Sequence, residues 1–151
     1  MAQGVFFEDI EVGRIDRFGH YEVRREEVID FASKYDPQPF HLDDEAAAKS
    51  HFGRLAASGW HTGAMSMAMM AKFFADVGYA SMGGAGLDQL RWVKPVYPGD
   101  TLTMEIEVKA KRRSKSRPEM GLLDQHFTVR NQHDEVVMTY VATGLVKVRE
   151  P

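Results

Sequence analysis

Apolar and polar residues alternate without interruption over residues 101–108, where every even-numbered position is apolar. A two-residue period predicts a β-strand with one buried face. Three other runs have the length and composition of strands, at 87–93, 122–130 and 136–148. The polar segment 131–135 predicts a turn between the last two runs. The C-terminal half therefore predicts four consecutive strands.

The N-terminal third predicts a strand and then a helix. Residues 14–23 are strand-like and are interrupted by Gly19. Over 25–35, apolar residues recur at three- and four-residue spacings, which is typical of a helix with one buried face. We expect this helix to end where Asp36 meets Pro37, because a residue before proline is pushed out of the α conformation.

Two further helices are expected before the strands. A short one begins at Asp43 or Asp44, either of which can cap it, and runs to Ser50. The longest candidate covers 59–77, has only two charged residues and is apolar around nearly its whole circumference. Such a helix is normally buried. Its methionines are interpreted as core filler rather than as a cofactor-binding stripe. They are Met65, Met67, Met69 and Met70.

Helices first and consecutive strands afterwards favour an α+β fold with an antiparallel sheet over alternating βαβ units. The long apolar helix suggests that a curved antiparallel β-sheet wraps around it. The length, 151 residues, is that of one ordinary domain, and neither a linker nor a repeat divides it. We therefore expect a single domain over residues 1–151.

Composition removes several classes of protein. The net charge of −3 gives no argument for a nucleic-acid or membrane surface, and the absence of cysteine excludes disulfides, a thiol nucleophile and cysteine-based metal sites. The first ten residues carry Glu8 and Asp9 and have no apolar core, so they do not resemble a signal peptide. No apolar run approaches the roughly 20 residues of a membrane span. We expect a soluble, cytoplasmic protein.

The first candidate for chemistry is the pair Asp36 and His41. Pro37 and Pro39 lie between them and are expected to hold the segment extended, which can fix the two titratable groups relative to each other. A carboxylate and an imidazole that reach one water molecule form a general acid–base pair. Alternatively, Asp36 only ends the helix and His41 is a polar loop residue.

The second candidate is Gly59, at the start of the long helix. A helix N-terminus offers unpaired N–H groups and partial positive charge, and a glycine there allows a ligand oxygen to approach the backbone. These features suit an oxyanion hole for a thioester carbonyl. The alternative is that Ser58 is an ordinary N-cap and Gly59 a loop hinge.

Together these features resemble the MaoC-like hotdog-fold dehydratases, a family that includes the (R)-specific enoyl-CoA hydratases. The hydratase motif has an aspartate, a proline and a histidine five residues after the aspartate, as in Asp36, Pro39 and His41. A glycine that opens the central helix corresponds to Gly59, and residues 91–100 look like the strand and turn that follow that helix. The resemblance runs from about residue 8 to residue 148.

The resemblance implies a hotdog fold that pairs as a homodimer or a higher assembly of dimers, with an acyl-CoA thioester entering a tunnel near the subunit interface. Asp36 would activate a water molecule and His41 would assist or deliver the α-proton, with the division of roles left open. The N–H of Gly59 would polarise the thioester carbonyl. Gln38, Phe40 and Trp60 would lie at the substrate pocket. No cofactor is implied beyond the CoA of the substrate.

Two departures from the family pattern concern the substrate more than the reaction. The hydratases typically have asparagine at the position of Gln38, which is one methylene longer. They also carry a polar residue further along the central helix, and Ser66 is near that position but one residue out of register.

Other signals are given a plainer interpretation. Five His and Asp residues could suggest a metal site, but no His-x3-His or His-x-His spacing supports one. They are His41, Asp43, Asp44, His51 and His61. The basic segment 109–117 is expected to be a solvated hairpin loop, although it could also attract CoA phosphates. Nucleic-acid binding is weaker because the segment lacks interleaved aromatic residues. Glycine-rich 83–86 is expected to be a flexible turn.

The sequence therefore predicts a hydro-lyase that hydrates a trans-2-enoyl-CoA or dehydrates the 3-hydroxyacyl-CoA. One alternative is a hotdog thioesterase in which Asp36 directs water at the carbonyl. Another is an acyl-CoA-binding subunit without turnover.

Overall fold

The computed structural model describes residues 4–150, which form five strands, three α-helices and two short 3-10 helices. In chain order these are η1 (Phe7–Asp9), β1 (Ile15–Glu22), α1 (Arg25–Tyr35), η2 (Pro39–His41), α2 (Asp44–Ala48), α3 (Gly59–Val77), β2 (Ser81–Trp92), β3 (Thr101–Arg113), β4 (Met120–Arg130) and β5 (Val136–Lys147). None of the helices among these residues is long and apolar enough to cross a membrane.

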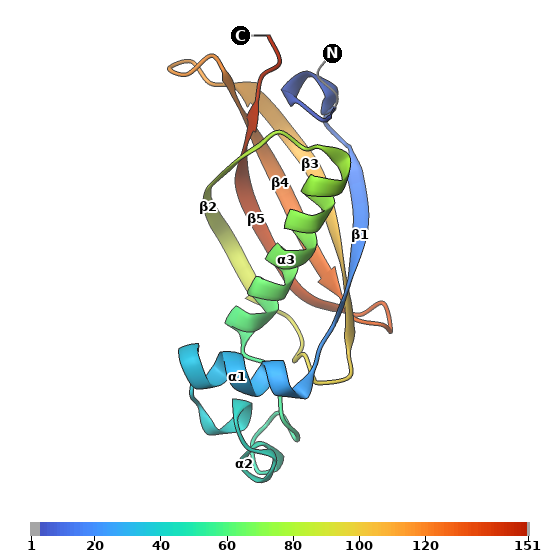
Figure 1. The fold of residues 1–151 in the computed structure, drawn as a ribbon, viewed down its shortest axis with the longest axis vertical. Coiled ribbons are helices and arrows are strands. Elements are labelled where there is room, and N and C mark those ends of the chain that lie inside the picture. The colour runs from blue at the N-terminus through green and yellow to red at the C-terminus, as the bar shows by residue number, and fades with distance from the viewer. Residues whose placement is uncertain (1–3, 151) are drawn as a thin grey trace.

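The five strands form one antiparallel sheet in the order β1-β3-β4-β5-β2 (Figure 1). The alternation along 101–108 is confirmed, because its four apolar side chains are at most 3% exposed while the polar ones between them are not buried. The strand order leaves β1 and β2 as the two edges of the sheet.

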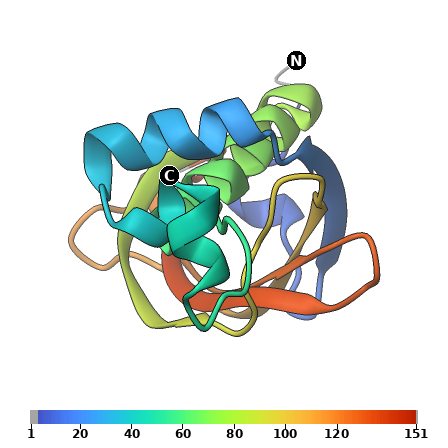
Figure 2. The same ribbon diagram turned by 90° about the horizontal axis from the view of Figure 1, so that it is seen from below.

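The sheet curves around α3, which lies along its concave face (Figures 1 and 2). The Ser58 hydroxyl caps the start of α3 by accepting from the N–H of Trp60 at 3.3 Å. Gly78 ends the helix in the left-handed conformation, with φ of 68°. This antiparallel sheet wrapped around one long helix is the hotdog fold, as predicted.

The expectation that α3 is buried on all sides is wrong. The sheet covers one face of the helix, where Met65 and Met69 are 1% and 4% exposed. The opposite face carries small alanines and remains exposed. Met67 is 48% exposed and is not core filler. A single sheet can cover only one side of a helix, so an apolar circumference alone does not establish burial.

Gly19 is where β1 bends. The register of β1 on β3 shifts between Phe18 and Tyr21, which marks a bulge. Gly19 has φ of +115°, and a Cβ there would lie 2.7 Å from the sulfur of Met69. Glycine therefore allows both the bulge and the close approach of β1 to α3.

Two sequence predictions fail in the C-terminal half. Residues 83–86 are part of β2 and not a turn, although the pairing of β2 with β5 is irregular there. The basic segment 109–117 is only partly a loop, because β3 continues to Arg113. The far end of this segment lies at the other end of the sheet from α1 and α2 (Figure 1).

The helices α1 and α2 lie together at the end of the sheet where α3 begins (Figure 2). This arrangement brings the end of α1 close to the start of α3, and so joins the two segments that hold the candidate residues.

Candidate active site

Asp36 and His41 are brought together by a turn and not by an extended segment. Asp36 is the C-cap of α1, and its N–H donates to the carbonyl of Ala32. After Pro37 the chain folds into η2, which ends at His41. Asp36 Oδ2 and His41 Nε2 lie 3.4 Å apart, and the side chains are 16% and 5% exposed. The predicted pair is adjacent in space, although the extended backbone expected between its members is wrong.

The neighbours of His41 define how its ring is protonated. Nδ1 lies 2.7 Å from the carbonyl oxygen of Ala56. A carbonyl oxygen can only accept, so Nδ1 carries a hydrogen, and in the neutral ring Nε2 is left as an acceptor. That nitrogen faces the Asp36 carboxylate, which also only accepts. A proton donor shared by the two groups, such as water, satisfies both.

The Asp36 carboxylate is stabilised in its charged form. Partial burial alone would raise the pKa of Asp36, but hydrogen bonds from Ser58 and Gln38, together with the positive charge of His41 when that ring is protonated, outweigh burial and lower the pKa below its ordinary value. The Gln38 amide donates to Asp36 Oδ1 at 2.6 Å. Gln38 thus holds the carboxylate in place.

Ser58, the N-cap of α3, hydrogen-bonds to the Asp36 carboxylate, so the N-terminus of α3 lies beside the pair. Within residues 4–150, the N–H of Gly59 has no hydrogen-bond acceptor, whereas the N–H groups of Trp60, His61 and Thr62 all bond to Ser58. This leaves the Gly59 N–H as a free donor at the positive end of the helix.

Gly59 is also required by packing. The indole of Trp92 lies against it, and a Cβ on Gly59 would come within 2.4 Å of that ring. Trp92 Nε1 donates to the Gly59 carbonyl oxygen at 2.9 Å. The close approach that a glycine allows here is therefore occupied by a side chain of β2.

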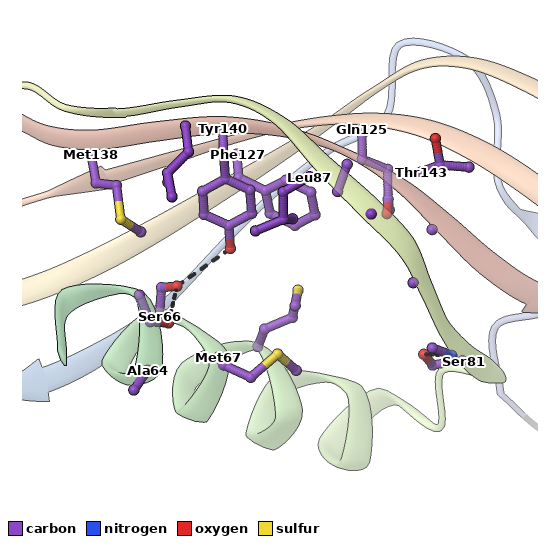
Figure 3. Close-up of a pocket in the computed structure, with 18 of the residues that line it drawn as sticks. Ala64, Ser66, Met67, Ser81, Leu87, Gln125, Phe127, Met138, Tyr140 and Thr143 are labelled. Atoms are coloured by element: carbon purple, nitrogen blue, oxygen red, sulfur yellow. Dashed lines mark hydrogen bonds between the residues drawn. The ribbon is translucent and has the colours of Figure 1, made fainter. Parts of the chain in front are cut away.

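A cavity of about 590 Å³ extends along α3 from Gly59 to Phe74, between that helix and the sheet. Strands β2, β4 and β5 supply the other walls, and most of the lining is apolar (Figure 3). Of the three residues expected at the substrate pocket, Trp60 lines this cavity. Gln38 and Phe40 line neither this cavity nor the smaller one between α1 and α3.

Sequence reasoning left Ser66 unassigned, and the structure places it inside the large cavity. Ser66 is 1% exposed, donates to the Gly63 carbonyl oxygen at 2.7 Å and lies 3.3 Å from the hydroxyl of Tyr140. Burial raises the pKa of Tyr140, so its hydroxyl remains protonated. A lone polar residue on an apolar helix face was the available signal for Ser66, whereas its partner on β5 depends on tertiary contact.

His61 joins α1 to α3. Its ring is 3% exposed, stacks on Phe31 with centroids 4.6 Å apart, and places Nε2 3.4 Å from Glu27 Oε1. Burial lowers the pKa of His61, and Glu27 offsets only part of that effect. Nδ1 of His61 is buried and has no partner in the described part of the chain. His61 therefore packs α1 against α3 next to the site.

The remaining candidates do not assemble into a cation site. Within residues 4–150, no group of three or more His, Cys, Asp or Glu side chains is placed to hold a metal ion. Asp43 instead caps α2 by accepting from the N–H of Ala46 at 2.9 Å.

Comparison with known proteins gives the same fold. The family model for the MaoC like domain matches residues 11–130. A MaoC-like dehydratase from Rhodospirillum rubrum is 39% identical, with a TM-score of 0.87 over 98% of this chain and 100% of that one. The uncharacterized protein YdeM of Bacillus subtilis is 29% identical over 93% of this chain and 97% of its own. The (R)-hydratase from A. caviae involved in PHA biosynthesis is 25% identical, with a TM-score of 0.68 over 93% of this chain and 98% of that one.

The family model covers most of the chain, including the paired Asp36 and His41 and the glycine that opens α3. The chain therefore belongs to the MaoC-like domain family.

Proposed function

We propose that this protein is a hydro-lyase that reversibly adds water to a trans-2-enoyl-CoA, giving the 3-hydroxyacyl-CoA. The observation that carries the proposal is the pair of facing acceptors, Asp36 Oδ2 and His41 Nε2, 3.4 Å apart. A water molecule that donates one hydrogen to each group keeps its oxygen lone pairs free for attack. The (R)-hydratase among the similar structures supports the same reaction class.

In the hydration direction, the water oxygen forms a bond to the β-carbon while Asp36 or His41 removes a proton from it. The electron pair of the carbon–carbon double bond moves toward the thioester, whose carbonyl oxygen becomes an enolate. A proton then passes from the pair to the α-carbon, so one water is consumed. Dehydration is the reverse. General acid–base catalysis of this kind contributes about 10²–10⁴-fold.

The developing enolate oxygen needs a hydrogen-bond donor. The Gly59 N–H is free within residues 4–150 and lies at the start of a 19-residue helix. A single donor of this kind contributes about 10²–10³-fold. The acyl group is assigned to the apolar cavity that begins at Gly59 and Trp60. This scheme uses no cofactor besides the CoA of the substrate.

Variants of the acid–base pair test the proposal with crotonyl-CoA. Asp36→Asn and His41→Ala are each expected to lower kcat at least 100-fold while the protein remains folded, as a cooperative melting transition would show. Asp30→Asn and His51→Ala, both at exposed positions nearby, are the matched controls and should keep wild-type turnover. Near-normal turnover by both site variants would show that the pair is not catalytic.

The same assay separates the alternatives. Release of free thiol instead of loss of the enoyl absorbance would indicate a thioesterase that directs the same water at the carbonyl. Neither change, together with a raised melting temperature in acyl-CoA, would indicate a binding subunit.

We also propose that the protein forms a homodimer through β2. This strand is an edge of the sheet, and six of the large apolar side chains exposed in the structure lie on β2, next to it, or on α3 facing it. They are Trp60, Met67, Met82, Leu87, Trp92 and Val93. Unpaired edge N–H and C=O groups together with exposed apolar residues favour pairing with a second strand.

A further inference from the structure

A hydrogen-bonded contact between the sheet and the helix crosses the large cavity partway along its length. The Tyr140 ring projects from β5 toward α3, and its hydroxyl meets Ser66 halfway along the helix (Figure 3). Ser66 has one hydroxyl hydrogen, which goes to Gly63, so the Tyr140 hydroxyl donates to Ser66. The Tyr140 ring is also stacked on Phe127, with centroids 4.5 Å apart. Tyr140 is thus held at both its ring and its hydroxyl.

The strand register places Tyr140 partway along the cavity. On the side of Gly59, Met138 pairs with Trp92, whose indole donates to Gly59. On the other side, Gly144 pairs with Gly84. The side near Gly59 is where the reaction is proposed to occur, and the far side extends to Phe74 and Tyr79.

We infer that Tyr140, held by Ser66, sets the depth of the acyl pocket and makes short enoyl-CoA thioesters the preferred substrates. This inference rests on the proposed function, which places the acyl group in this cavity. Ser66 follows Gly59 by seven residues, which is about 10 Å along a helix. Because its bonds zigzag, an extended acyl chain advances about 1.25 Å per carbon–carbon bond, so about nine carbons span this length. Longer chains meet the Tyr140 ring.

The test is the dependence of kcat/KM on chain length, measured with trans-2-enoyl-CoAs of four to twelve carbons. For the wild type, kcat/KM should fall at least tenfold between the eight-carbon and twelve-carbon substrates. Tyr140→Ala should raise the twelve-carbon value at least tenfold relative to the four-carbon value. Tyr140→Phe and Ser66→Ala, which keep the ring but remove its anchor, should relax the limit by a smaller factor.

Thr139→Ala is the matched control, because Thr139 is the neighbour of Tyr140 on the opposite face of β5 and should leave the profile unchanged. Tyr140→Leu replaces Tyr140→Ala if the alanine variant fails to fold. A wild type that hydrates the twelve-carbon substrate as well as the four-carbon one overturns the inference. So does a folded Tyr140 variant with the wild-type profile.

Binding of saturated acyl-CoAs of four, eight and twelve carbons, measured by calorimetry on the same proteins, separates this inference from the proposed function. A length limit in binding that Tyr140→Ala removes, without any hydration, supports the pocket depth and contradicts the hydratase. Hydration with a chain-length profile that Tyr140→Ala leaves unchanged supports the hydratase and contradicts the inference that Tyr140 sets the pocket depth. Failure to bind or convert any of these compounds contradicts both.

Discussion

At the scale of single residues, the site consists of two acceptors facing each other with their other contacts already made. His41 is oriented by the Ala56 carbonyl, and Asp36 by Gln38 and Ser58. The motif of an aspartate and a histidine five positions later predicted the pair, since both members lie in one short segment. The 3-10 turn that joins them and the hydrogen bond from Gln38 depend on neighbouring contacts and could not be predicted from spacing.

Gln38→Leu tests how the carboxylate is held. The Gln38 amide is one of the groups that lower the pKa of Asp36, so its removal should raise that pKa toward the ordinary value. If the carboxylate must be charged for turnover, activity is lost as pH falls through the pKa of Asp36. The acidic limb of the kcat/KM profile should therefore move to higher pH in Gln38→Leu. An unchanged limb would mean that another group controls it.

Gly59→Ala tests the packing at the helix start. The added methyl group would overlap the Trp92 indole, and overpacking of this kind typically costs about 1–3 kcal/mol. Urea unfolding should show that loss in Gly59→Ala, and most of it should vanish when Trp92→Ala is the background. An equal cost in both backgrounds would mean that the contact with Trp92 does not explain the glycine.

At the scale of elements, the strands with clear alternation and the helices with clear periodicity were predictable, while β2 was only half predicted. Three of the four residues at 83–86 are glycines, which carry no side-chain pattern, and only pairing with β5 makes them a strand. The exposure of one face of α3 also could not be predicted, because it depends on how many layers cover the helix. The contact between α1 and α3 at His61 likewise depends on tertiary packing, so the sequence pattern did not predict it.

His61→Phe tests that contact through pH. Because burial lowers the pKa of His61 below 6.5, the folded protein binds fewer protons than the unfolded chain, and stability falls as pH falls through that value. Phenylalanine keeps a ring against Phe31 but cannot titrate. The free energy of unfolding should therefore decrease less from pH 7 to pH 5 in the variant than in wild type. Parallel decreases would contradict a buried, neutral His61.

At the scale of the whole molecule, the two sheet edges differ. The β2 edge is glycine-rich and carries the exposed apolar residues Met82, Leu87 and Trp92, whereas Ile15 is the one large apolar residue exposed on β1 among the residues described. Nothing in the sequence pattern alone identifies which strand is at an edge, because strand order is a tertiary property.

Leu87→Asp tests the proposed dimer. Leu87 is 56% exposed on β2, and Ile15, 45% exposed on β1, provides the matched control on the opposite edge. In sedimentation velocity the wild type and Ile15→Asp should be dimers, and Leu87→Asp should shift toward the monomer by at least tenfold in dissociation constant. A monomeric wild type, or a dimer broken only by Ile15→Asp, would place the interface elsewhere or remove it.

The central claim is that the water held by Asp36 and His41 adds to an enoyl thioester. The most direct measurement follows the enoyl absorbance of crotonyl-CoA and a few branched or longer enoyl-CoAs over time, with a thiol reagent in a parallel reaction. We predict that the absorbance falls to an equilibrium value without release of thiol, and that Asp36→Asn abolishes the change. Thiol release at the rate of absorbance loss, or constant absorbance with every substrate, would contradict the hydratase.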